Sequence, residues 1–260
     1  MNEKLNELKN CIKKYSPAMI AFSGGVDSTL LLKVAKDVLN DNVAAFIGKC
    51  GTHPEFETKE AVEFAEGIKT KYYLYDTSEL LKEKVFKFHP HDLCYYCKHL
   101  MFSKAQKFAN DYGYRYILEG TNTSDLEGHR PGYKAIKELD IKSPFIEANI
   151  DKQDIRQISR SLGLKTHDKA SFACTATRIA KGIPITEDLI SKIEKIETYL
   201  YNENFKQFRA RYNGESIRIE LYPSEFKRIV NDIIRLRLID LCNSLGFDAV
   251  YLDLVGYVDK

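Results

Sequence analysis

The sequence lacks a long apolar run. None of its 260 residues lies in a stretch that approaches the roughly 20 consecutive apolar residues of a membrane-spanning helix. The N-terminal segment 1–15 also lacks the apolar centre of a secretory signal peptide. Its Leu5, Leu8 and Ile12 instead have the spacing of one face of an amphipathic helix. We therefore expect a cytoplasmic protein with no membrane partner.

An excess of charge of one sign is also absent. The chain has 39 Lys and Arg against 37 Asp and Glu, which gives a net charge of +2. A net charge so close to zero does not indicate nucleic-acid binding, although a local basic patch could still bind a small anion. No internal repeat or low-complexity linker is present, and the length allows one large domain or two unequal ones.

The six cysteines do not predict structural disulfides, because a cytoplasmic compartment keeps thiols reduced. Cys11 on the first helix and Cys242 in an apolar segment are expected to be buried. Cys50 follows the second predicted strand and is expected to serve packing; the alternative is a spare thiol near a ligand site. Cys94, Cys97 and Cys174 are left as candidate ligands or reagents.

Short apolar runs alternate with helical patterns through the first two thirds of the chain. The predicted strands are 17–22, 43–47, 71–75 and 114–120, and the predicted helices lie near 27–40, 55–67, 97–112 and 150–164. This alternation predicts an α/β fold with a doubly wound parallel sheet. Ligands of such sheets bind at the carboxyl ends of the strands. The turn at 23–25 and the segment 120–125 both follow strands, so we expect them to converge.

The pattern changes after about residue 180. Segment 187–200 is helical, and segments 208–212 and 216–221 alternate like strands on either side of an Asn-Gly turn. Two further helical stretches and a final β-type run complete a smaller α+β unit. We predict two domains, with boundaries 1–178 and 179–260.

The segment Ser23-Gly24-Gly25 follows a buried strand and opens a helix near Asp27. Its glycines tolerate positive φ and expose successive N–H groups, and the helix directs its positive end at the same point. The turn therefore predicts a phosphate or pyrophosphate site, where Asp27 could hold Mg²⁺ or cap the helix. It is neither a Walker loop nor a G-x-G-x-x-G loop. The alternative is a structural turn capped by Ser28. The hydroxyl donors of the site would be Ser23, Ser28 and Thr29.

The string AFSGGVDST at 21–29 resembles the PP-loop of the ATP pyrophosphatase family, which includes GMP synthetase, NAD synthetase and tRNA-thiolating enzymes. The resemblance implies a fold like that of the adenine nucleotide alpha hydrolases and the use of ATP with Mg²⁺. It also implies cleavage between the α and β phosphates, so that the substrate becomes an adenylate and pyrophosphate leaves. The implied ATP-binding residues are Ser23, Gly24, Gly25, Asp27, Ser28, Thr29, Gly120, Thr121, Asn122 and Asp125.

Two residues near the second nucleotide-facing segment have alternative interpretations. Asp125 is a candidate for the metal side together with Asp27, and its alternative is a helix cap. Arg130 lies in the matching Arg-Pro-Gly segment, and its alternative is a structural ion pair.

Longer segments resemble the LarE-type sulfur transferases, namely 92–102, 119–139, 141–186 and 252–257. That family acts in the synthesis of the nickel-pincer nucleotide, the cofactor of lactate racemase. The resemblance implies an enzyme that adenylates a carboxylate of pyridinium-3,5-biscarboxylic acid mononucleotide and converts it to a thiocarboxylate. Because the family commonly assembles as hexamers, the resemblance also implies a homo-oligomer.

In the matching pattern, Arg209 and Arg211 bind the phosphate of the nucleotide substrate. They alternate on a predicted strand and so face one side, which suits a phosphate. The alternative is a solvated strand face. Glu197 matches a site glutamate, and Arg178 matches a basic residue beside a reactive cysteine at the position of Cys174.

The source of the sulfur depends on three cysteines. In one branch of the family, a lone cysteine at the position of Cys174 gives up its own sulfur and becomes dehydroalanine. This chain also has Cys94 and Cys97, whose C-x-x-C spacing puts two thiolates within reach of one metal centre. Three thiolates suit a 4Fe–4S cluster with one open iron, and the resemblance to three-cysteine members implies that sulfide passes from it to the adenylate. Thr177 stands where a serine is common and keeps the hydroxyl.

Other interpretations stay open. A zinc site of three cysteines with His89, His91 or His99, or unliganded thiols with a sacrificial Cys174, also fits the spacing. A PP-loop tRNA thiolase would use a similar cluster, but the near-neutral charge makes nucleic acid an unexpected partner. A non-catalytic metal or cluster carrier conflicts with the intact glycine turn. The sequence does not predict the sulfide donor.

Overall fold

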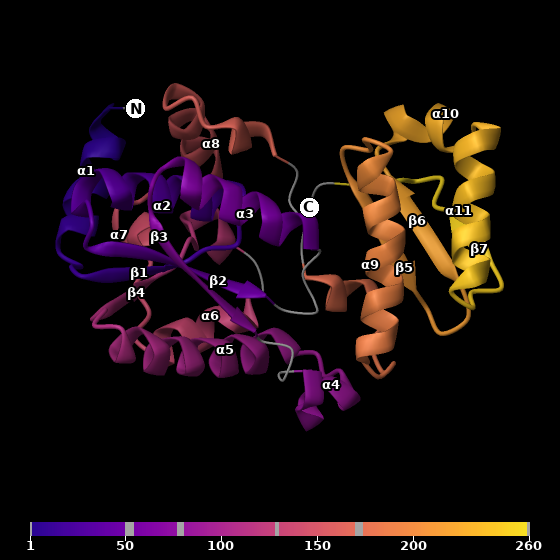
Figure 1. Ribbon diagram of the computed structural model, residues 1–260, viewed down its shortest axis with the longest axis horizontal. Helices are drawn as coiled ribbons and strands as arrows, with labels where there is room; N and C mark the ends of the chain where they lie inside the picture. The colour runs from indigo at the N-terminus through magenta and orange to yellow at the C-terminus, as the bar shows by residue number, and fades with distance from the viewer. Residues whose placement is uncertain (1, 50–54, 77–80, 128–129, 170–173, 259–260) are drawn as a thin grey trace. The chain divides into compact units, whose positions relative to one another are not determined.

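The computed structural model describes residues 2–49, 55–76, 81–127, 130–169 and 174–258. Contacts divide these residues into two compact units (Figure 1), the second of which comprises 81–91 and 174–258. The sequence predicts a single boundary after residue 178. The second unit instead takes up an earlier short segment and the turn that carries Cys174. Local sequence pattern does not reveal with which unit a short segment packs.

The first unit contains a four-stranded sheet between helices. Its elements are α1 (Asn2–Lys13), β1 (Ala18–Ala21), α2 (Val26–Leu39), β2 (Val43–Lys49), α3 (Glu55–Gly67), β3 (Lys71–Asp76), α5 (Leu93–Asp111), β4 (Tyr116–Leu118), η2 (Thr123–Leu126), α6 (Pro131–Glu138), α7 (Pro144–Glu147), α8 (Lys152–Ser161) and η3 (Lys165–Asp168). The strand order is β3-β2-β1-β4, and all pairs are parallel. The predicted doubly wound α/β fold is therefore confirmed.

Alternate residues of the central strands point to two faces, and each face has its own apolar core. Ile20 and Ala45 belong to the core formed with α1, α2, α3 and α8. Met19 and Phe46 belong to the core formed with α5 and α6, which Figure 1 shows below the sheet. A strand buried on both faces is apolar throughout, which is why these strands are continuous apolar runs in the sequence.

The strand order reverses between β1 and β4. The chain runs outward from β1 through β2 to β3, and β4 then pairs with the other side of β1, with Met19 opposite Ile117. Such a switch point opens a crevice at the carboxyl ends of the two strands. The turn at 23–25 and the segment 119–125 both leave the sheet at this crevice.

The second unit is a smaller α+β structure, as the sequence predicts. Its elements are α4 (Lys84–Phe88), η4 (Thr175–Arg178), α9 (Glu187–Asn202), β5 (Phe208–Tyr212), β6 (Ile217–Leu221), η5 (Pro223–Glu225), α10 (Phe226–Ile229), α11 (Asp232–Ser244) and β7 (Val250–Leu252). β5 and β6 form the expected antiparallel hairpin, and β7 pairs parallel to β6. In the described part of the chain, every helix is too short or too polar to cross a bilayer.

Candidate active site

The turn after β1 is fixed by its neighbours and open at its tip. Gly24 has φ +74°, and a Cβ at this position would lie 3.1 Å from the Cβ of Ala61 on α3. Only glycine fits this left-handed position so close to a helix. The Ser23 hydroxyl lies 3.1 Å from the Ser28 hydroxyl and accepts the N–H of Gly25 at 3.4 Å. Among the described residues outside its chain neighbours, a Cβ on Gly25 would meet only that Ser23 oxygen within 4 Å, so the described part of the chain leaves the tip of the turn open.

The helix that follows the turn is uncapped by any side chain. Gly25, and not Ser28, is the N-cap residue of α2, and it makes no side-chain capping bond. The positive end of α2 and its first N–H groups are therefore available to an anion. The Thr29 hydroxyl is buried and has no hydrogen-bond partner in the described structure, so its predicted contact with ATP stays a prediction.

The segment after β4 packs directly against this turn. A Cβ on Gly120 would lie 3.2 Å from the Cβ of Asp27 and 3.3 Å from the backbone nitrogen of Ser28. The chain is held there by Glu119, a buried carboxylate that accepts the Thr121 N–H at 3.1 Å, the Thr121 hydroxyl at 2.6 Å and the Ser143 hydroxyl at 2.5 Å. The two segments thus converge, as their positions after strands predict, although Glu119 was not among the predicted residues.

The carboxylate of Asp125 is bound by residues near it in the sequence. It accepts the backbone N–H of Asn122 at 3.2 Å and the side-chain N–H of the same residue at 2.9 Å. It also forms an ion pair with Arg130, whose side chain is 60% exposed. The structure thus shows the cap and the ion pair that were the alternatives for these two residues. The metal role of Asp125 stays a prediction.

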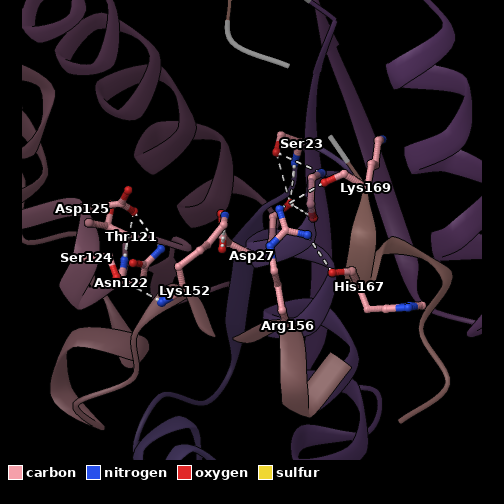
Figure 2. A network of polar contacts seen from close by, with 12 residues as sticks. Ser23, Asp27, Thr121, Asn122, Ser124, Asp125, Lys152, Arg156, His167 and Lys169 are labelled. Atoms are coloured by element: carbon pink, nitrogen blue, oxygen red, sulfur yellow. Dashed lines mark hydrogen bonds and ion pairs between the residues drawn. The ribbon is translucent and has the colours of Figure 1, made fainter. Parts of the chain in front are cut away.

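An ion pair that was not predicted lies beside the glycine turn. Lys152, the first residue of α8, places its Nζ 2.8 and 2.7 Å from the two carboxylate oxygens of Asp27 (Figure 2). Burial raises the pKa of the Asp27 carboxyl; Lys152 opposes this shift, and the charge of Asp125 adds to it. The carboxylate predicted to hold Mg²⁺ is therefore already paired with a cation.

Two more cations tie the end of the first unit to the glycine turn. Lys169 donates to the carbonyl oxygen of Gly24 at 3.1 Å and to a carboxylate of α3 at 2.7 Å. Arg156 donates to the carbonyl oxygens of His167 at 2.7 Å and Lys169 at 3.4 Å (Figure 2). The spacing of Lys152 and Arg156, four residues apart on a capped helix, puts both on one face and was the signal available in the sequence.

In the second unit, Arg178 and Glu197 form a fully buried ion pair. Their side chains are 0% exposed, and the Glu197 carboxylate accepts Nε and Nη2 of Arg178 at 2.7 and 3.2 Å and the N–H of Ala210 at 3.0 Å. Arg178 also donates to the Thr177 hydroxyl at 3.0 Å and to the carbonyl oxygen of Cys174 at 3.4 Å. The pair therefore fixes the η4 turn that begins after Cys174. A catalytic role for either residue stays a prediction.

Arg209 and Arg211 share a face of the β5–β6 hairpin, as their alternation predicts. Arg209 is buried, and its guanidinium lies 4.9 Å from the ring centroid of Tyr257. Burial, and next the charge of Arg178, lower the pKa of Arg209 to about 10. Arg211 is more exposed and donates to Glu220 at 2.6 Å and to a carbonyl oxygen of η4 at 3.1 Å. Both arginines thus border the turn that follows Cys174.

Cys94 and Cys97 lie on the first two turns of α5, which starts four residues before the predicted helix. The Cys94 side chain is exposed and that of Cys97 is half-buried. Three residues apart on a helix, the two thiols share a face. Among the described residues, no three His, Cys, Asp or Glu side chains cluster closely enough to hold a metal. Cys174 belongs to the other unit, and the three-cysteine ligand set stays a prediction.

One histidine of the zinc alternative has other partners. His89 is buried in the second unit, with Nδ1 3.3 Å from the Ile183 carbonyl oxygen and Nε2 3.2 Å from Nζ of Lys181. Burial lowers the pKa of this imidazole. Cys11 and Cys242 are buried, as predicted. Cys50 lies outside the described residues.

Several known proteins resemble the chain. An uncharacterized protein of Synechocystis sp. is 35% identical over 257 residues, which cover 99% of this chain and 96% of that protein. The pyridinium-3,5-bisthiocarboxylic acid mononucleotide synthase of Lactiplantibacillus plantarum is 32% identical over 249 residues, 95% of this chain and 88% of that protein. A glutamine-hydrolyzing GMP synthase component of Thermoplasma volcanium is 27% identical over 173 residues, 62% of this chain and 55% of that protein. No family model matches the chain.

The parallel sheet, the open glycine turn at its switch point and these relatives define an enzyme of the PP-loop ATP pyrophosphatase type. The chain belongs to the family of LarE-type sulfur transferases, because it matches the L. plantarum synthase at 32% identity over nearly the whole length of both proteins. The family resemblance stated from the sequence motifs is thereby confirmed. The iron–sulfur variant within that family stays a prediction.

Proposed function

We propose that this protein is an ATP-dependent sulfur insertase that acts on pyridinium-3,5-biscarboxylic acid mononucleotide in nickel-pincer nucleotide synthesis. It adenylates one carboxylate and then replaces an oxygen of that group by sulfur, with AMP and pyrophosphate as the other products. Family membership supports this proposal. The observation that carries it is the glycine turn at 23–25, which is fixed, open at its tip and followed by an uncapped helix beside Asp27.

In the first step, the turn holds the phosphates of ATP. A carboxylate oxygen of the substrate attacks the α-phosphorus, the bond to the β-phosphate breaks, and pyrophosphate leaves. The N–H groups of the turn and the positive end of α2 stabilise the charge on the departing group. Mg²⁺ commonly binds one or two carboxylates together with phosphate oxygens. Asp27 and Asp125 offer such carboxylates, and the charge of Asp125 is close enough to raise the pKa of Asp27. When bound, the ion offsets phosphate charge.

The phosphate of the substrate is proposed to bind Arg209 and Arg211. The guanidinium of Arg209 lies against the ring of Tyr257, and the guanidinium of Arg211 is partly exposed beside the η4 turn. A phosphate that binds Arg211 competes with Glu220 for the guanidinium. Two guanidinium groups on one strand face can contact the phosphate together, which fixes the orientation of the substrate.

In the second step, sulfur adds to the acyl carbon of the adenylate, and AMP leaves with the electron pair of the broken C–O bond. We propose Cys94, Cys97 and Cys174 as ligands of a 4Fe–4S cluster, a ligand set taken from the family resemblance. The donors fit: thiolates select iron–sulfur clusters, and Cys94 and Cys97 share one face at the start of α5. When bound by three thiolates, such a cluster has an open iron that can carry a sulfide.

Pyrophosphate release tests the first step. The purified protein is given ATP, Mg²⁺ and the dicarboxylate substrate, and pyrophosphate and the thiocarboxylate product are measured. Asp27→Asn should lose both, whereas Asp37→Asn on the exposed side of the same helix should lose neither. Wild-type protein that releases no pyrophosphate with this substrate would overturn the proposal. Release without a thiocarboxylate would limit it to adenylation.

Iron and acid-labile sulfide content test the sulfur route. Protein prepared without oxygen should hold about four irons and lose them in Cys94→Ala and Cys174→Ala. Cys11→Ser is the matched control, because the thiol of Cys11 donates to Glu147 and its helix α1 packs on the face of the sheet opposite α5. Iron-free protein that resists reconstitution would contradict the cluster. Loss of the sulfur of Cys174 after one turnover, seen by mass spectrometry, would then assign the sacrificial route.

We also propose a homo-oligomer formed through the second unit. Its segment 230–258 exposes large apolar side chains, among them Ile233, Leu236, Leu254 and Val255 at 64%, 51%, 81% and 74% exposure. Exposed apolar side chains in such numbers are typical of contact surfaces between proteins. Light scattering should show an oligomer that Leu254→Glu dissociates; a monomeric wild-type protein would contradict this.

A further inference from the structure

The pairing of Asp27 with Lys152 occupies the place that a metal ion needs. Nζ of Lys152 lies within 2.8 Å of both carboxylate oxygens. The two side chains are 27% and 33% exposed, so a ligand entering from solvent can reach them. Like charges repel strongly at such short range in a partly buried crevice. A divalent cation that binds either oxygen of this carboxylate is therefore repelled by the ammonium on it.

The backbone of Lys152 is held by hydrogen bonds, and its side chain is long enough to turn. Its backbone N–H donates to the Ser124 hydroxyl at 3.2 Å, and the preceding Asp151 caps α8 by accepting the N–H of Asp154 at 2.8 Å. The four-carbon stem of a lysine still allows its ammonium to turn toward a new anion. Figure 2 shows this side chain reaching from the segment of Asn122 and Ser124 toward Asp27, whose helix starts at the glycine turn.

The three cations around the turn differ in the groups that their side chains bind. Lys169 is bound to the Gly24 carbonyl oxygen and to a carboxylate of α3, and Arg156 is bound to two carbonyl oxygens. Both therefore hold backbone segments in place. Lys152 has a carboxylate as its side-chain partner, and that carboxylate is the group that Mg²⁺ takes in the proposed function.

We infer that Lys152 is an exchange residue: it holds Asp27 in place of a metal in the nucleotide-free protein, and it passes to the phosphate oxygens when a metal–nucleoside triphosphate complex delivers Mg²⁺ to Asp27. The incoming complex supplies both new partners at once, a cation for the carboxylate and an anion for the ammonium. A free divalent ion supplies only the first, so it must displace the lysine without compensation. The site thereby selects the metal–nucleotide complex over the metal alone. This inference rests on the ATP step of the proposed function and not on its sulfur step.

Manganese binding without nucleotide tests the exchange directly. Mn²⁺ is titrated into the full-length protein, and free Mn²⁺ is followed by electron paramagnetic resonance. Lys152→Met should bind Mn²⁺ at least about tenfold more tightly than the wild type, and Asp27→Asn in the same background should remove the gain. Lys33→Met is the matched control, since Lys33 holds both oxygens of Asp37 on α2 in the same way but beside no phosphate site. It should leave Mn²⁺ affinity unchanged.

A kinetic measurement tests the second position of the lysine. Lys152→Met should raise the KM for Mg·ATP in pyrophosphate release about tenfold or more, and Lys152→Arg should recover part of the loss. Circular dichroism confirms that each variant is folded. Equal Mn²⁺ affinity of Lys152→Met and wild type, or an unchanged KM, overturns the exchange. A wild-type protein that releases pyrophosphate but forms no thiocarboxylate overturns the proposed sulfur step and leaves both readouts intact.

Discussion

Glu197→Gln should destabilise the second unit strongly. The Glu197 carboxylate is fully buried and accepts three hydrogen bonds, two from Arg178 and one from the N–H of Ala210. Glutamine keeps the shape but removes the negative charge, so the Arg178 guanidinium remains buried without its counter-ion. Removing one partner of a buried ion pair costs about 3–5 kcal/mol of folding free energy.

The size of the effect makes it easy to measure. At roughly 2–4 °C per kcal/mol for a chain of this length, Tm should fall by roughly 6–20 °C. Far-UV circular dichroism is the suitable probe, since the chain has no tryptophan. Hydrogen exchange should localise the change to peptides of β5, where the Ala210 N–H loses a charged acceptor. Glu187→Gln, on the exposed first turn of the same helix, should change stability by less than about 0.5 kcal/mol.

A second variant tests the reasoning about charge. Arg178→Met combined with Glu197→Leu removes both charges, and apolar replacement of a buried ion pair is often neutral or stabilising. The double variant should therefore unfold at a higher temperature than Glu197→Gln. A Tm of Glu197→Gln within the range of the Glu187→Gln control would refute the idea that this pair holds the unit together.

Three further predictions concern the first unit and the thiols. Gly24→Ala should abolish pyrophosphate release and cost about 1–2 kcal/mol, because its φ of +74° is left-handed; normal turnover would contradict this. Lys169→Met should raise the KM for ATP about tenfold, since the Gly24 carbonyl loses its anchor; an unchanged KM would argue against that anchor. At pH 8, iodoacetamide should label Cys94 in cluster-free protein before Cys11 or Cys242. Burial raises the pKa of these two thiols to about 12 and about 11, so below those values they stay protonated and unreactive. Peptide mass spectrometry measures the order, and early labelling of Cys242 would contradict it.

β1 and β2 were predictable because they are buried on both faces, and β3, a half-buried strand, was predictable from its run of Tyr and Leu. β1, β2 and β3 begin and end within two residues of the apolar runs. β4 is shorter than its run at 114–120, and directly after it the Glu119 side chain accepts three hydrogen bonds. The sequence pattern also did not reveal the start of α5. Cys-Tyr-Tyr-Cys has no apolar period, and the helix begins after Asp92 through local backbone bonds and not through an amphipathic face.

The candidate site was predictable where it is contiguous in sequence. Residues 23–29 lie on one turn and one helix end, so their chemistry is visible in a single string. Lys152 and Lys169 are brought to that turn by tertiary packing, which no local pattern encodes. The pairing of Arg178 with Glu197 likewise depends on how α9 packs on η4. Spacing indicates which residues can act, and packing decides which of them are already engaged.

The three cations that contact the glycine turn or its neighbours come late in the chain. The turn itself is made early, but Lys152, Arg156 and Lys169 all follow β4. During synthesis from the N-terminus, the glycine turn is thus made long before the three cations that complete the proposed triphosphate site. The last of these lysines is followed five positions later by Cys174. The last cation that contacts the turn and the residue proposed for sulfur delivery therefore leave the ribosome almost together.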